Sequence, residues 1–292
     1  GVNAITSNYL LLAVPVIILI SVYYLNYASL RSKLYVDGSL KEKAQVATTT
    51  DMAWTRKFGD IAPFLQLDLK LIMRNKRPRS SVFILVIGLL YGLFFYPQEI
   101  YADKEWLYVF VGTFVTGIFM INFGQFIPAW DSGYYKLLMS QNIKYKEYLN
   151  SKYALMIMVS IVMFVLSIPY VYFGWKILVV HFATLIYNLG INVYVLLYAG
   201  SFNRKKIDLT QRAAFNYQGT GAVQWLVGFP LLFVPVAIFL LPYFTLGFEA
   251  AVGTLIALGV VGIVFHQKLM NIITKKYLES KHKMISAFDQ SN

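Results

Sequence analysis

Long, almost uncharged apolar stretches alternate with polar segments along most of this chain. Each stretch is long enough to cross roughly 30 Å of hydrocarbon as a helix. Polar or charged residues bound every one of them, so the pattern predicts seven membrane-spanning helices and an all-α polytopic membrane protein. The predicted spans are residues 8–28, 81–97, 106–129, 153–174, 177–200, 221–241 and 245–265.

The composition excludes several other classes of protein. The chain is 58% hydrophobic and only 14% charged, whereas soluble domains carry about 25% charged residues. It contains no cysteine, which excludes a disulfide framework and a thiolate metal site. It has no glycine-rich phosphate loop ending in Lys-Ser or Lys-Thr, so we expect the chain itself to bind no ATP and no other cofactor.

The positive charges are segregated by loop. Residues 29–80, 130–152, 201–220 and 266–292 hold 24 of the 26 Lys and Arg residues. The alternate loops hold only Lys104 and Lys176. Because basic loops stay in the cytoplasm, this alternation predicts an outside N-terminus and a cytoplasmic C-terminus. The net charge of +12 is therefore explained by membrane topology, and we expect no nucleic-acid partner.

The first span has two interpretations. The sequence begins at Gly1 without an initiator methionine, and residues 1–7 carry no charge, although a secretory signal needs a basic region before its apolar core. Residues 1–28 are then either the last span of a missing preceding half, or a short N-terminal tail that translocates with its span. Residues 29–60 are polar, and we expect them to form a cytoplasmic linker.

Residues 61–79 are predicted to form an interfacial elbow helix, apolar on one side and basic on the other. Pro78 is expected to break it, and Ser80 or Ser81 to cap the following span. Asp68 projects from the apolar side. It either reaches the headgroup layer or a nearby arginine, or pairs with a basic residue of another cytoplasmic element. The residues expected to anchor anionic lipid headgroups are Arg74, Lys76, Arg77 and Arg79.

Polar residues recur at helical spacing inside the apolar stretches. Thr184, Asn188 and Asn192 share one face of the 177–200 span, and Asn122 and Gln125 lie near the cytoplasmic end of the 106–129 span, where they could face that set. Polar groups in hydrocarbon usually face the bundle interior or a cavity. These five residues therefore either form interhelical hydrogen bonds or line a substrate path.

The segment 130–152, WDSGYYKLLMSQNIKYKEYLNSK, is longer and more polar than a turn between two spans requires. We call it the island. It is predicted to form a short amphipathic helix, a break and a second helix start. The charge pattern puts it on the cytoplasmic face, where it is either a docking surface or an interfacial helix resting at the headgroups.

In its order of elements, residues 61–265 resemble the permease part of ABC-type exporters of the type-2 class. In that class an elbow helix precedes six spans, and the loop between the second and third spans forms a coupling helix that docks on a separate ATPase. The island contains the matching acid and glycine, Asp131 and Gly133, then a Leu-rich stretch with a serine, an aliphatic residue, basic residues and the ending Ser151-Lys152. Asn142 stands where the class usually has proline, and the outer link at 242–249 is shorter than is typical.

The chain is also similar to a poorly characterised bacterial membrane family related to that class, through the segments RNKRPRS (74–80) and GQFIPAW (124–130). The resemblance implies a six-span bundle over 81–265, a cytoplasmic C-terminal helix over 266–292 and a location in the bacterial cytoplasmic membrane. The residues it assigns to ATPase docking are Asp131, Gly133, Tyr135, Lys136, Leu137, Leu138, Ser140, Ile143, Lys144 and Tyr145.

The implied partners are a soluble ABC ATPase subunit, which would carry ATP and Mg, a second permease half or copy, and anionic lipids. Three alternatives stay open. A secondary transporter normally needs an ionisable residue at mid-membrane, and the spans offer none. An intramembrane enzyme would need a dyad such as Ser160 or Ser167 with His181, without a supporting motif. A non-catalytic scaffold is the third.

Overall fold

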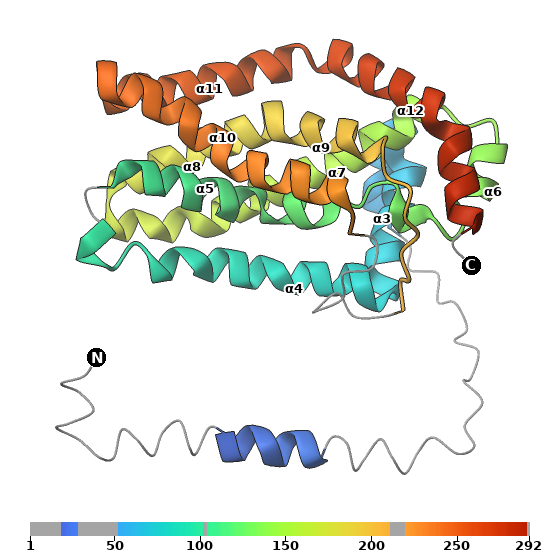
Figure 1. The fold of residues 1–292 in the computed structure, drawn as a ribbon, viewed down its shortest axis with the longest axis horizontal. Coiled ribbons are helices and arrows are strands. Elements are labelled where there is room, and N and C mark those ends of the chain that lie inside the picture. Colours follow the sequence, from blue (N-terminus) through green and yellow to red (C-terminus); the bar gives the residue numbers. More distant parts are fainter. Residues whose placement is uncertain (1–18, 29–51, 102–103, 211–219, 291–292) are drawn as a thin grey trace. The chain divides into compact units, whose positions relative to one another are not determined.

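The computed structural model describes residues 19–28, 52–101, 104–210 and 220–290 (Figure 1). The chain divides into two compact units, Gly1–Asp51 and Met52–Asn292. In the first unit, residues 19–28 are helical. Most of the predicted span 8–28 and of the predicted linker 29–60 therefore lies outside the described residues.

The described part of the second unit is entirely helical. Five of its helices are long and apolar enough to cross a membrane. A sixth span exists if Phe248–Val264 and His266–Asp289, which are bent by 66° at a short break, count as one. These helices confirm a multi-pass, all-α membrane protein. The five spans are Lys76–Phe94, Glu105–Gly124, Tyr145–Phe173, Trp175–Gly200 and Ala222–Leu246.

Several spans consist of more than one helical segment. Two of them contain a π-helical turn, η4 in the second span and η7 in the fourth, a feature that is often found at functional sites. The α-helices are α3 Ala62–Arg74, α4 Lys76–Tyr91, α5 Glu105–Phe119, α6 Tyr135–Ser140, α7 Tyr145–Ser167, α8 Trp175–Tyr187, α9 Val193–Gly200, α10 Ala222–Leu246, α11 Phe248–Val264 and α12 His266–Gln290. The shorter segments are η1 Ala53–Ile61, η2 Gly92–Phe94, η3 Glu99–Tyr101, η4 Met120–Gly124, η5 Ala129–Asp131, η6 Ile168–Phe173 and η7 Asn188–Asn192.

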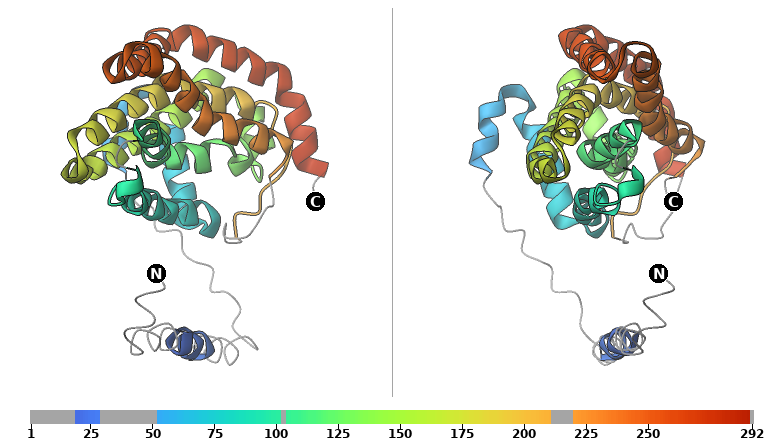
Figure 2. Two further views of the ribbon diagram at one scale, coloured as in Figure 1. Left: turned by 60° about the vertical axis from the view of Figure 1, so that its left-hand side comes forward. Right: turned by 90° about the vertical axis from the view of Figure 1, so that its left-hand side faces the viewer.

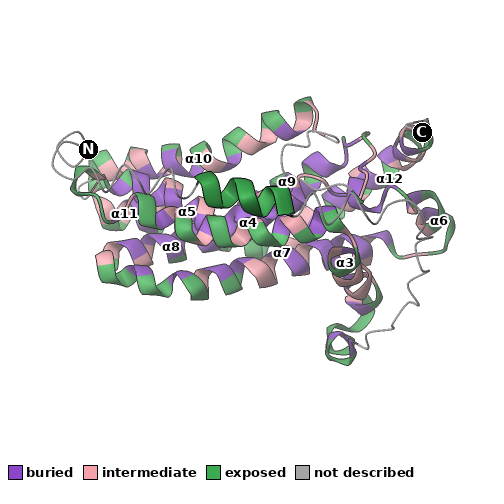
Figure 3. Cartoon of the chain, turned by 90° about the horizontal axis from the view of Figure 1, so that it is seen from below, coloured by how far each residue is buried: buried purple, intermediate pink, exposed green. Residues whose placement is uncertain are grey.

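The spans lie side by side, and the second and fourth form the centre of the bundle (Figures 1 and 2). Their apolar windows are 78% and 72% buried, against 28% for the first span and 22% for α10. Figure 3 shows the contrast, with buried residues along the inner helices and exposed ones along α4. The outer faces expose large apolar side chains such as Phe83 and Leu226, which requires a lipid environment.

The closest helix crossing is made by glycines of η7 and α11. A Cβ atom added at Gly190 would lie 1.8 Å from the carbonyl oxygen of Gly259, and one added at Gly262 would lie 1.7 Å from that of Gly190. Small residues are what allow backbones to approach this closely in membranes. The three glycines therefore determine how near α11 lies to the central span.

The elbow region differs from the expectation in its break point. Asn75, with φ −107° and ψ 139°, separates α3 from α4, so Arg77, Pro78 and Arg79 belong to the first turn of the span. Proline is tolerated there because the amides of a first turn have no partner within the helix. The Ser80 hydroxyl donates to the Arg77 carbonyl oxygen (2.6 Å) and caps no helix. The helix α3 runs across one end of the bundle (Figure 1).

We call this end, where α3, α6 and α12 gather, the basic end. The helix α12 packs against α7 and α9, and Phe288 on α12 meets Tyr135 of α6 edge-on at 5.4 Å between ring centres. The predicted C-terminal helix thus forms, and it covers one side of the island.

Candidate functional site

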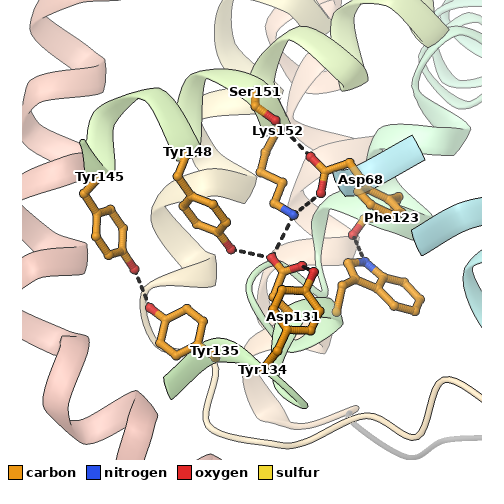
Figure 4. Close-up of polar contacts among 10 residues, drawn as sticks. Asp68, Phe123, Asp131, Tyr134, Tyr135, Tyr145, Tyr148, Ser151 and Lys152 are labelled. Atoms are coloured by element: carbon orange, nitrogen blue, oxygen red, sulfur yellow. Dashed lines mark hydrogen bonds and ion pairs between the residues drawn. The ribbon is translucent and has the colours of Figure 1, made fainter. Parts of the chain in front are cut away.

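A buried lysine, Lys152, lies between two aspartates and connects the base of the island to α3 and α7 (Figure 4). The Lys152 ammonium on α7 lies 2.8 Å from a carboxylate oxygen of Asp131 in η5. It also pairs with Asp68 of α3. All three side chains are at most 1% exposed. One ammonium therefore connects three separate elements at the basic end.

Hydroxyl groups complete the shell of both carboxylates (Figure 4). Tyr148 donates to Asp131 across 2.6 Å, and Tyr134 donates to the other oxygen of the same carboxylate. Ser151 donates to Asp68 across 2.9 Å. Buried charges are tolerable only when paired and hydrogen-bonded in this way. We call these six residues the charged cluster.

Local sequence explains how the cluster assembles. Tyr148, Ser151 and Lys152 are three and four residues apart on α7, so they share one helix face. The loop carrying Asp131 is held down by Trp130, whose indole N–H donates to the Phe123 carbonyl oxygen (2.8 Å) and whose ring stacks on that of Phe123. The adjacent acid is thereby directed toward α7.

Two carboxylates share a single ammonium in a site with almost no solvent. Burial raises the pKa of Asp68 from 3.8 to about 6; Lys152 opposes this shift and the nearby Asp131 adds to it. Burial and the neighbouring Asp131 also raise the pKa of the Tyr134 hydroxyl, which therefore stays protonated as a donor at neutral pH. With all three charged groups ionised, the cluster carries one net negative charge.

The short helix α6 has two different faces. Tyr135 and Met139 are buried, and the Tyr135 hydroxyl is hydrogen-bonded to that of Tyr145 at the start of α7. On the other face Leu137 is 65% exposed, and Lys136 is exposed beside it. Leu137 is thus a single exposed apolar side chain on this face of α6.

Ion pairs and a capping bond connect the island to its neighbours at the surface. Lys136 pairs with Asp289 of α12 at 2.8 Å, and Lys144 pairs with Asp60 at 3.1 Å. The Lys281 ammonium donates to the Met139 carbonyl oxygen (2.8 Å), in the last turn of α6. Exposed ion pairs of this kind contribute little stability, so the buried cluster is the stronger connection.

The sequence was compared with known protein families, and one family matches. The profile described as "Family of unknown function (DUF5687)" matches residues 1–291. The chain belongs to the DUF5687 family. No curated protein and no solved structure matches it.

In this DUF5687 protein the predicted docking residues divide by exposure. The side chains of Asp131, Tyr135 and Tyr145 are buried in the chain's own core, so they support the island from beneath and form no part of its exposed surface. Leu138 and Ile143 are half-buried. The exposed members are Gly133, Lys136, Leu137, Ser140 and Lys144, which we call the outer face of the island.

Two of the predicted path-lining residues are hydrogen-bonded between helices. The Asn188 amide donates to the Thr116 hydroxyl (2.8 Å) on α5. The Asn192 amide donates to the Asn188 side-chain oxygen (2.7 Å) and the Leu231 carbonyl oxygen (3.1 Å). Thr184 donates to the carbonyl oxygen of His181 on its own helix. The bonds from Asn188 to Thr116 and from Asn192 to Leu231 therefore run between helices, whereas the bond of Thr184 stays within its own helix.

Asn122 and Gln125 do not face that set. Both side chains instead line a hollow of about 380 Å³ at the basic end, together with Arg77 of α4. Arg77 is only 2% exposed, with its guanidinium 5.9 Å from the centre of the Phe126 ring. Arg77 is therefore not exposed on the outer surface, where the predicted headgroup anchors were expected, while Arg74, Lys76 and Arg79 are exposed.

The sequence interpretation missed the role of Lys152, which seemed only to end the island. The available signal was Asp68, an acid on an apolar helix face, for which pairing with a distant basic residue was one of two open interpretations. The other interpretation, in which Asp68 reaches the headgroup layer or a nearby arginine, was wrong. The family resemblance gave no ion-pair partner for Asp68. Lys152 and Asp68 are 84 positions apart in the sequence, so no local pattern could pair them.

One pair considered for an intramembrane enzyme does come together. His181 Nδ1 lies 2.9 Å from the Ser167 hydroxyl, and Tyr96 OH lies 2.6 Å from its Nε2. Ser167 and His181 are 0% exposed, so no substrate reaches them in this conformation. The described residues also contain no cluster of three metal-ligating side chains.

Proposed function

We propose that this chain is the membrane-spanning permease subunit of an ATP-driven exporter, with a separate nucleotide-binding subunit docking on the outer face of the island. One observation carries the proposal: a short helix with an exposed apolar side chain is joined through a buried charged cluster to the span that follows it and to α3. A coupling element needs both properties.

Leu137 is the expected anchor. Fully burying a leucine contributes roughly 1.5–3 kcal/mol, and a leucine that is 65% exposed has most of that still to gain from a partner. Lys136 and Lys144 flank the surface and would meet acidic or carbonyl groups at the rim. In most interfaces a small number of residues carries most of the binding energy, and Leu137 is the candidate for that role here.

The charged cluster supplies the transmission. Asp131 lies immediately before the island helix, and Lys152 lies in the span that follows it. Because Lys152 also pairs with Asp68, a push on α6 is resisted by the loop after η4, by α7 and by α3 together. Movement of the island would then displace these elements as one body.

The test uses two leucine substitutions at the basic end. Leu137→Glu on the outer face should abolish both co-purification with a nucleotide-binding ATPase and stimulation of its ATP hydrolysis in proteoliposomes. Leu278→Glu, at a 51% exposed position on α12, is the matched control and should leave both unchanged. Leu137 is a cleaner probe than Lys136 or Lys144, because both lysines already pair within the chain.

Equal ATPase stimulation in the wild type and the Leu137→Glu variant, with both proteins folded and inserted, would contradict the proposal. So would the absence of any ATPase from the wild-type complex purified from its native membrane.

A further inference from the structure

A second feature of the basic end points to a lipid. The hollow of about 380 Å³ between the first and second spans is lined by polar groups at one end and by apolar side chains along α4. The polar groups are Arg77, Ser80, Ser81, Asn122 and Gln125; the apolar wall of α4 is Phe83, Ile84 and Ile87.

The polar end has unused hydrogen-bonding capacity. Within the part of the chain that the structure describes, the side-chain amides of Asn122 and Gln125 form no hydrogen bond, although both residues are half-buried. Neither amide is sealed inside the bundle, so both are accessible from the hollow. By contrast, Asn188 and Asn192 in the same bundle are fully engaged. A ligand with hydrogen-bonding groups would supply the missing partners.

The charge around this end favours an anion. Arg74, Lys76, Arg77 and Arg79 cluster where α3 meets α4, and Asp208 interacts electrostatically with Arg77. Among the residues that the structure describes, no acidic side chain lines the hollow. Basic pockets between spans on the cytoplasmic side are typical binding sites for anionic headgroups.

The apolar end fits an acyl chain in both length and access. Arg77 and Ile87 are ten residues apart on α4, which is about 15 Å at 1.5 Å per residue. That is half of the roughly 30 Å hydrocarbon core, or one leaflet. Phe83 and Ile87 are 68% and 63% exposed, so the wall of the hollow opens directly to the surrounding lipid.

We propose that this hollow binds one anionic phospholipid of the leaflet at the basic end, with its phosphate near Asn122, Gln125 and Arg77 and one acyl chain along Phe83, Ile84 and Ile87. The site does not depend on the proposed export function. A lipid bound here would lie between the first two spans, beside Trp130 at the root of the island.

The test compares two substitutions on α4 in the full chain. The purified protein is reconstituted into nanodiscs of equal parts dioleoyl phosphatidylglycerol and dioleoyl phosphatidylcholine, and retained lipid is counted by native mass spectrometry. The wild type should retain one phosphatidylglycerol in preference to phosphatidylcholine. Ile87→Trp, which fills the apolar end, should reduce that retention by roughly tenfold. Val86→Trp, equally exposed to lipid at 56% but outside the hollow, should retain as much as the wild type.

A second variant examines the polar end without touching the charges. Asn122→Leu combined with Gln125→Leu should reduce the preference for phosphatidylglycerol while the protein remains monodisperse. Equal retention of the two lipids by the wild type, or equal loss in Ile87→Trp and Val86→Trp, would overturn the proposal. Displacement of the retained lipid by inorganic phosphate alone would also overturn it, because the site would then recognise a free anion.

Discussion

Lys152 and Asp131 form an ion pair at 2.8 Å, with side chains only 1% and 0% exposed. Asp131 ends the irregular segment after the second span, and Lys152 lies in the third span, so their contact closes the island into a loop with a fixed base. Asp68 extends the same pair to α3.

Removing the ammonium should be much more damaging than removing one carboxylate. Lys152→Met leaves two carboxylates buried without a counter-charge, a change that costs about 3–5 kcal/mol. Asp68→Asn keeps one lysine–aspartate pair and should cost clearly less. Thermal unfolding of the detergent-purified variants, followed by size-exclusion chromatography, measures the difference. Equal losses in the two variants would mean that the cluster is not a coupled unit.

The stability of the protein should depend on pH through Asp68. The pKa of Asp68 is about 6 in the folded chain against 3.8 ordinarily. At pH values between these two, the folded chain therefore keeps a proton on Asp68 that the unfolded chain has lost. Stability therefore falls as pH rises through this window. The melting temperature of the wild type should drop more than that of Asp68→Asn between about pH 4 and pH 6.5. Parallel curves for the two proteins would assign the dependence to other groups.

Adding one methyl group at the tightest helix crossing should separate α11 from the central span. Gly190→Ala places a Cβ 1.8 Å from a backbone oxygen of Gly259, and overpacking of this kind costs about 1–3 kcal/mol or more. Gly253→Ala on α11 has nothing within 4 Å of its new Cβ, so better helix propensity should leave it neutral or slightly stabilising. Melting temperatures of the two variants check this directly, and a neutral Gly190→Ala would refute the crossing.

Two asparagines of similar sequence context should respond differently to the same change. Asn188→Val removes the amide that bonds Thr116 across helices, and interhelical bonds of this type contribute about 0.6–2 kcal/mol. Asn122→Val removes an amide that forms no bond within the described chain, so its stability should change by less than about 0.5 kcal/mol. If the Asn122 variant proves the less stable of the two, the assignment of their environments is reversed.

The helix boundaries show where sequence reasoning succeeds and where it fails. The spans were predictable because an apolar run must meet the bilayer whatever its neighbours are. The break at Asn75 was not predictable. Proline breaks a helix when it lies in the interior but is tolerated in the first turn, so Pro78 could mark the end of one helix or the start of the next. Only the position of α3 against α7 decides between the two.

The island shows the same division at the level of the site. Its amphipathic character and position in the chain followed from local pattern, but the family resemblance assigned ten residues to one docking surface. Packing against α7 and α12 places Tyr135 and Tyr145 inside. Tyrosine is suited to either location, so its exposure depends on which helix lies opposite.

By itself, then, the sequence determined the class of protein, the described spans and a polar island between two of them, because hydrophobicity and charge act on each segment independently. The tertiary structure decided which side chains meet, Lys152 with Asp131 and Asp68 and Asn188 with Thr116, and which residues line the hollow. The physical reason is that a buried charge or amide must be satisfied by whichever group packing brings near, and these groups come from segments up to 84 residues apart.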